Sequence, residues 1–151
     1  MASNVKPIPD GYKTVTPYLN LKDAHTFIDF AKKAFGAEER ARMAMPDGKI
    51  GHAEITIGDS IMMLSEAMQA PHKSGSFFVY VTDVDAWMAR AEKAGCKVDM
   101  PAANQFWGDR FGKLTDPFGN GWAVATHIED VAPAEMERRS VEEMKKFQQQ
   151  K

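Results

Sequence analysis

The stretch PYLNLKDAHTFIDFAKKAFG, residues 17–36, decides the fold because its outline returns as FFVYVTDVDAWMARAEKAG, residues 77–95. Each copy begins with a short apolar run and continues through an aspartate, Asp23 or Asp83, that suits a helix N-cap. Apolar residues at helical spacing follow, up to a glycine that suits the helix end. The chain therefore contains a repeated unit that starts with a strand and a helix.

Three strand-like stretches follow each predicted helix, and turn sequences such as PDG at residues 46–48 separate them. Each half thus reads β-α-β-β-β. A helix in such a unit covers one face of its curved sheet, and the other face needs a second module or a ligand. We predict an α+β fold of two tandem βαβββ modules that enclose a cavity, followed by a C-terminal helix because Pro133 suits a first helical turn. The predicted parts are an N-terminal arm 1–10, a domain 11–130 made of modules 11–67 and 76–128, and a tail 131–151.

The composition excludes several classes of function. Charged residues make up 26% of the 151 residues and the net charge is −2, without a cluster of Lys and Arg, so nucleic acid is not an expected partner. The apolar runs are far shorter than a membrane span, and we expect a cytoplasmic protein with no membrane partner. Cys96 is the only cysteine, which rules out an internal disulfide and a cysteine-based zinc site.

Several short motifs, in order along the repeat, resemble the glyoxalase / bleomycin-resistance / extradiol-dioxygenase (vicinal oxygen chelate) superfamily, in its PhnB-like branch. They are TVTPYL at 14–19, KAFGAE at 33–38, MPDGKIGHAE at 45–54, QFWGDR at 105–110, DPFG at 116–119 and ATH at 125–127. The resemblance covers about residues 9 to 139. It implies the two-module fold, a cavity for a small molecule, and a homodimer in which modules from two chains complete each cavity.

The resemblance also implies four positions at which metal-dependent relatives place His, Gln or Glu ligands. Aligned by the local motifs, these positions fall on Thr16, Met63, Phe77 and Ala123. Such side chains lack the imidazole and carboxylate donors that a divalent metal needs here, so we expect no metal at this set. We expect the four residues to line a cavity that favours an apolar or aromatic ligand.

Two ionisable residues, His52 and Glu54, alternate with the apolar residues Ala53, Ile55 and Ile57. The alternation predicts that His52 and Glu54 share the face turned away from the helix. They are candidate catalytic residues, and a divalent metal bound there is an alternative. The other interpretation is a hydrogen-bonded ion pair that orders the strand.

The segment around Trp107, Asp109 and Arg110 is the second candidate for ligand contact. An aromatic ring beside an arginine suits a planar or carboxylated ligand, whereas the alternative is that Trp107 packs on the tail and Arg110 is a structural clamp. Overall we expect a binding protein for a small, partly apolar molecule. The alternative is a metal-dependent lyase, isomerase or dioxygenase with a non-standard site at His52 and Glu54.

Overall fold

A computed structural model describes residues 6–66 and 72–149 of the chain. A boundary between Gly75 and Ser76 divides the described chain into two compact units, which are called module one and module two below. Residues 1–5 of the predicted arm, residue 67 of the first predicted module and residues 150–151 of the predicted tail lie outside the described residues.

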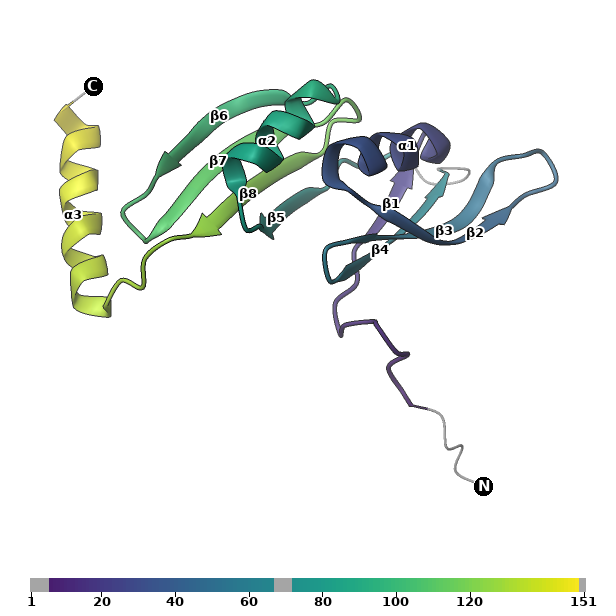
Figure 1. The fold of residues 1–151 in the computed structure, drawn as a ribbon, viewed down its shortest axis with the longest axis horizontal. Helices are drawn as coiled ribbons and strands as arrows, with labels where there is room; N and C mark the ends of the chain where they lie inside the picture. The colour runs from purple at the N-terminus through teal and green to yellow at the C-terminus, as the bar shows by residue number, and fades with distance from the viewer. Residues whose placement is uncertain (1–5, 67–71, 150–151) are drawn as a thin grey trace. The chain divides into compact units, whose positions relative to one another are not determined.

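Module one contains one helix and one four-stranded sheet (Figure 1). Its elements are β1 (Tyr18–Leu21), α1 (Ala24–Phe35), β2 (Glu38–Ala44), β3 (Ile50–Ile57) and β4 (Ser60–Glu66). The strand order is β1-β4-β3-β2, in which β1 runs parallel to β4 and the other neighbours are antiparallel. This is the predicted β-α-β-β-β unit.

Module two repeats that arrangement (Figure 1). Its elements are β5 (Ser76–Tyr80), α2 (Val84–Lys93), β6 (Lys97–Asn104), β7 (Asp109–Thr115) and β8 (Gly121–His127), followed by α3 (Pro133–Gln149). The strand order β5-β8-β7-β6 again has one parallel pair, β5 with β8. The predicted fold class, two tandem βαβββ modules and a C-terminal helix, is confirmed.

Both covering helices begin at the predicted aspartates. Asp23 accepts a hydrogen bond from the Thr26 backbone N–H, and Asp83 accepts one from the Ala86 backbone N–H, each at 2.9 Å. Such a bond satisfies one of the backbone donors left free at a helix start. α1 ends at Gly36, whose φ of 65° is left-handed and favours glycine.

Each helix packs on one face of its own sheet. Under α1 lie the buried side chains of Ala53 and Ile55 on β3 and of Leu64 on β4. Under α2, which carries the buried Trp87, lie Leu114 and the fully buried Trp122. Burying a large aliphatic or aromatic side chain contributes about 1.5–3 kcal/mol, so these two faces hold the modules together.

Two strand ends bear on the predicted site. Thr16, one of the four implied ligand positions, precedes β1, which starts at Tyr18, and its hydroxyl donates to the Lys13 carbonyl at 3.2 Å. β6 reaches Asn104, close to the loop of Trp107, through two register shifts against β7. Among the helices of residues 6–66 and 72–149, none combines the length and apolar character needed to cross a bilayer.

Candidate functional site

The second face of each sheet is not covered by a helix of its own module in the described residues, and it is called the open face below. Strand alternation and register assign residues to it, since directly paired residues point to the same side. On module two, the paired residues Phe78 and Ala123 belong to this face, and so do Phe111 and Lys113. On module one, the equivalent pair is Tyr18 and Met63.

Four aromatic side chains gather on the open face of module two and are called the aromatic cluster: Phe78, Tyr80, Trp107 and Phe111. The Phe78 ring stacks on the Phe111 ring at 5.7 Å between centroids and lies 5.0 Å from the Tyr80 ring. Trp107 meets Phe111 edge-on at 5.6 Å. Phe111 is buried, while Phe78 is 52% exposed and Tyr80 is 65% exposed. The cluster therefore presents partly exposed aromatic surface on the open face.

The carboxylate of Asp109 holds two rings of the aromatic cluster in place by hydrogen bonds. One oxygen accepts hydrogen bonds from the Tyr80 hydroxyl and the Trp107 indole N–H, both at 3.0 Å. The other oxygen lies 2.8 Å from His127 Nδ1. The Asp109 side chain is only 3% exposed, so these partners replace its water. Asp109 thus fixes the orientation of two aromatic rings and is a positioning residue.

His127 extends this network towards the tail. Its Nε2 atom lies 2.9 Å from the Asp130 carboxylate, so the ring bridges two acids. Hydrogen bonds to Asp130 and then to Asp109 raise the pKa of His127 above its ordinary value, because both acids favour the charged imidazolium. The hydrogen bond to Asp109 also raises the pKa of Tyr80, since losing the phenolic proton would leave two facing anions.

The open face of module one carries a different cluster, centred on Glu54. One of its oxygens accepts a hydrogen bond from the Tyr12 hydroxyl and lies 3.3 Å from His52 Nε2. The other lies 3.5 Å from an Arg40 nitrogen, and the Arg40 guanidinium lies over the Tyr12 ring at 5.4 Å. The Tyr12 bond, followed by His52 and Arg40, lowers the pKa of Glu54 despite the opposing effect of burial. Glu54 is therefore a charged, hydrogen-bonded group that ties the chain before β1 to the sheet.

The predicted orientation of His52 and Glu54 agrees with the register. Glu54 pairs with Met63, whereas Ala53 and Ile55 pair with the buried Leu64 and Met62. Met63 is also on the open face, as predicted. The arrangement around Glu54 matches the ion-pair interpretation, because each carboxylate oxygen already has a partner. Whether His52 or Glu54 takes part in catalysis stays a prediction.

Two other predicted site residues point towards the helices. Phe77 pairs with Trp122 and lies 4.7 Å from that ring, so the prediction that Phe77 faces the cavity is wrong and Phe78 takes the place. Arg110 lies opposite Thr126 in the sheet. Its guanidinium forms a bidentate ion pair with Asp85 of α2, at 2.6 and 2.7 Å. The prediction that Arg110 contacts the ligand is therefore wrong, because adjacent strand residues point to opposite sides, and the alternative of a structural clamp fits this ion pair.

The residues at the four implied ligand positions do not fit a metal. Of the implied residues Thr16, Met63, Phe77 and Ala123, only Met63 and Ala123 lie on the open faces, where they pair with Tyr18 and Phe78. Neither pair offers the imidazole or carboxylate donors expected of zinc or a harder divalent ion. In the described parts of the chain, no three His, Cys, Asp or Glu side chains lie close enough together to hold a metal ion.

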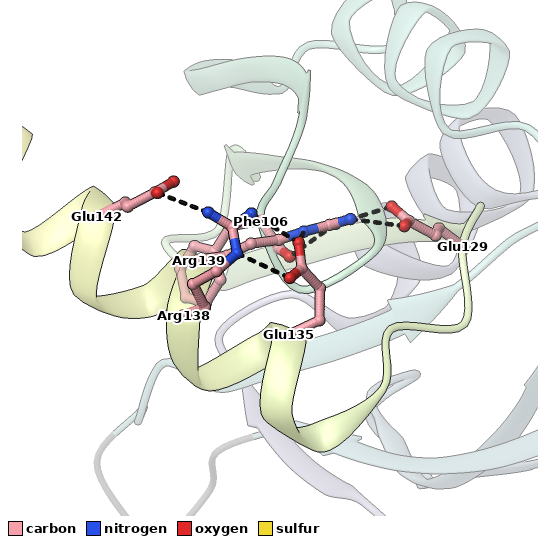
Figure 2. Close-up of polar contacts among 6 residues, drawn as sticks. All are labelled: Phe106, Glu129, Glu135, Arg138, Arg139 and Glu142. Atoms are coloured by element: carbon pink, nitrogen blue, oxygen red, sulfur yellow. Dashed lines mark hydrogen bonds and ion pairs between the residues drawn. The ribbon is translucent and has the colours of Figure 1, made fainter.

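The tail joins module two through Arg139 of α3 (Figure 2). Its guanidinium binds both oxygens of Glu129, at 2.8 and 2.9 Å, and bonds to Glu135 at 2.7 Å. It also reaches the Phe106 carbonyl at 3.4 Å, in the loop that carries Trp107. Gly108 in this loop has a φ of 97°, and a Cβ there would lie 2.1 Å from the Glu129 carbonyl. The chain after β8 is therefore packed against the loop of the aromatic cluster.

The fold defines a class of proteins with two tandem βαβββ modules, in which a helix packs on one face of each sheet. The model of the Glyoxalase/Bleomycin resistance protein/Dioxygenase superfamily matches residues 13–124. The chain belongs to this superfamily, and the resemblance noted in its motifs is confirmed.

Two other proteins have similar sequences over most of their length. The Mycobacterium bovis protein named Uncharacterized protein Mb0911c is 36% identical over 143 residues, which cover 87% of this chain and 90% of that protein. Protein YjdN of Escherichia coli K12 is 32% identical over 108 residues, which cover 64% of this chain and 73% of YjdN.

Solved structures of the same fold are also similar. Protein PA1353 from Pseudomonas aeruginosa is 26% identical with a TM-score of 0.63, over 78% of this chain and 99% of that one. A PhnB protein from Bacillus cereus has a TM-score of 0.61 at 17% identity, over 76% of this chain and 99% of that one. At that identity the second comparison describes the fold alone.

Proposed function

We propose that this protein binds a small, partly apolar molecule on the open face of module two, without the four-ligand metal site of metal-dependent relatives. The observation that carries the proposal is the aromatic cluster, in which Phe78 and Tyr80 are about half exposed or more on the open face of the module. Exposed apolar groups that gather in this way mark surfaces for ligands or partners.

The aromatic cluster suits a planar apolar ligand for two reasons. Aromatic rings bury large areas and prefer offset stacks or edge contacts with other rings, which the outer side of Phe78 can offer. The rings are also held in place before any ligand arrives, because Asp109 accepts bonds from Tyr80 and Trp107. Preorganised groups lose less conformational freedom on binding, which favours affinity.

A neutral aromatic probe, N-phenylnaphthylamine, tests this proposal by fluorescence titration of the full chain. Phe78→Ala removes a half-exposed ring that contacts both Tyr80 and Phe111, so we expect binding to weaken roughly three- to tenfold, as for the loss of one aromatic pair. The matched control is Tyr18→Ala, at the equivalent position of module one, which should leave binding within about twofold. Absence of saturable binding to the unmodified chain, or equal affinity of all three proteins, would contradict the proposal.

A second candidate function is a metal-dependent lyase, isomerase or dioxygenase reaction at His52 and Glu54. The observation in its favour is that an imidazole and a carboxylate lie 3.3 Å apart on the open face of module one. A bound metal would have to displace the partners of Glu54 and find further ligands. Calorimetric titration with Zn²⁺, Ni²⁺ and Fe²⁺ tests it: stoichiometric binding that His52→Ala abolishes would favour this candidate, and no heat of binding would exclude it.

A further inference from the structure

We propose that the ligand carries an anionic group, such as a carboxylate, phosphate or sulfonate, beside its apolar body, and that Lys113 binds this group. The inference rests on the proposed function, because it concerns the ligand of the same face. It follows from the register of module two and from the charges on its open face.

Lys113 lies in one row with the exposed part of the aromatic cluster. It is paired with Ala123 on β8, and Ala123 is paired with Phe78 on β5. The row across the three strands is therefore a cation, a methyl group and an exposed ring. The Lys113 ammonium also lies 5.9 Å from the centroid of the Phe111 ring, which stacks on Phe78. A planar molecule on Phe78 would place its edge next to this ammonium.

The acidic groups around this face are already engaged. Asp109 is buried and accepts bonds from Tyr80 and Trp107, with His127 at its other oxygen. At the β6 edge, Asp99 accepts a hydrogen bond from the Thr115 hydroxyl at 2.5 Å and has Lys97 Nζ at 3.6 Å. Neither acid is free to receive a cationic ligand.

Lys113, in contrast, is an exposed cation with no carboxylate within ion-pair distance among the residues that the structure describes. Arg110, the other basic residue of β7, points to the opposite face and is held by Asp85. The Lys113 ammonium is therefore a positive charge without an ion-pair partner among the described residues, and it lies next to the aromatic cluster. An ammonium is a compact charge with three donors, which suits a single anionic group, and its alkyl stem packs on apolar surface.

Fluorescence titration with two matched probes tests the inference on the full chain. Anilinonaphthalene sulfonate carries an anion, and N-phenylnaphthylamine has a similar ring system without it. Lys113→Gln should weaken binding of the sulfonate roughly two- to fivefold, the size expected for a solvent-accessible ion pair, and leave the neutral probe unchanged. The loss should shrink as salt is added, because salt screens the contact. Lys93→Gln, which makes the same charge change on α2, should alter neither probe.

The outcomes separate this inference from the proposed function. If both probes bind but Lys113→Gln and Lys93→Gln affect the sulfonate equally, Lys113 is not the anion site, while the aromatic binding face stands. If the neutral probe does not bind the unmodified chain, or binds regardless of Phe78→Ala, the proposed function itself fails. Recovery of sulfonate binding in Lys113→Arg, together with loss in Lys113→Gln, supports the inference because Arg restores the charge.

Discussion

Leu64 in module one and Val124 in module two are both fully buried beneath their helices, whereas Met63 and Ala123, one residue earlier on each strand, face the open side. The helix-covered faces of the two modules thus carry the same kind of side chain at equivalent places. The open faces of the two modules carry different side chains at equivalent places. Module one has a polar cluster centred on Glu54, and module two has the aromatic cluster anchored by Asp109.

The strand pairing shows that the two open faces differ in charge at equivalent positions. Glu54 on β3 pairs with Met63, and Lys113 on β7 pairs with Ala123, so an acid in module one stands where module two has a base. Dense packing restricts what a buried face accepts, while an open face is free to specialise. The two modules therefore share a scaffold, and module two is the one whose open face carries clustered aromatic rings.

The largest expected effect is on the mass of the particle in solution, which shows whether two chains pair. Both open faces expose apolar side chains, such as Tyr18 and Phe78, and pairing of two chains would bury such surface. We predict a homodimer, so sedimentation equilibrium at micromolar concentration should give twice the chain mass. Comparing Tyr18→Glu with Phe78→Glu then shows which open face takes part. A monomer across the concentration range would contradict the prediction.

A substitution under a helix should cost far more stability than one on the neighbouring open-face residue. Leu64→Ala leaves a cavity and should lower the free energy of unfolding by about 2–5 kcal/mol. Met63→Ala, one position away, should cost about 1 kcal/mol or less, because its site is partly open to water. Urea denaturation measures both, and equal losses would refute the assignment of faces.

Neutralising the acid of each open face, Asp109 or Glu54, should lower the free energy of unfolding by different amounts. Asp109→Asn removes the negative charge and one of the two acceptor oxygens of a buried site, so it should cost about 1–3 kcal/mol of stability. Glu54→Gln should cost less than Asp109→Asn, because Glu54 keeps 13% exposure and its partner Arg40 reaches solvent. Denaturant unfolding of the two variants side by side gives the comparison. A larger loss for Glu54→Gln would reverse the ranking of the two clusters.

The smallest effect is the pH dependence of the His127 contacts. Because the folded state raises the pKa of His127, its contribution to stability is fully present below the unfolded value of about 6.5 and is lost as pH rises through the folded pKa. The stability difference between the unmodified chain and His127→Gln should therefore shrink as the pH rises above about 6.5. Proton NMR titration of His127 should show a lower pKa in Asp130→Asn, and no change there would exclude Asp130 as the main cause.

Much of the fold was predictable because it depends on local signals. Helix spacing, the capping residues Asp23 and Asp83, and the PDG turn at residues 46–48 act over a few residues, and each fell where expected. The orientation of His52 and Glu54 was also predictable, since it depends only on alternation along one strand. These parts need no knowledge of the neighbouring strand.

The errors come from register and from contacts that are distant in sequence. A shift of one residue moves a side chain to the opposite face of a sheet, which is why Phe77 was predicted where Phe78 lies. Arg110 is a different case, because alternation along β7 already puts it on the opposite side from Asp109, and expecting both at the ligand overlooked this. Tyr12 donates a hydrogen bond to Glu54, 42 residues away in sequence, and no local sequence pattern predicts this contact. Phe111 and Tyr80 could have been found by extending alternation from Asp109 and Phe78.

The placement of the tryptophans has a spectroscopic consequence. All three, Trp87, Trp107 and Trp122, belong to module two, while module one has the tyrosines Tyr12 and Tyr18. Intrinsic tryptophan emission therefore monitors the melting of module two alone, whereas far-ultraviolet circular dichroism follows both modules. Coincident transitions would mean that the chain melts as one cooperative unit. Separate transitions would assign each step to a module without any added label.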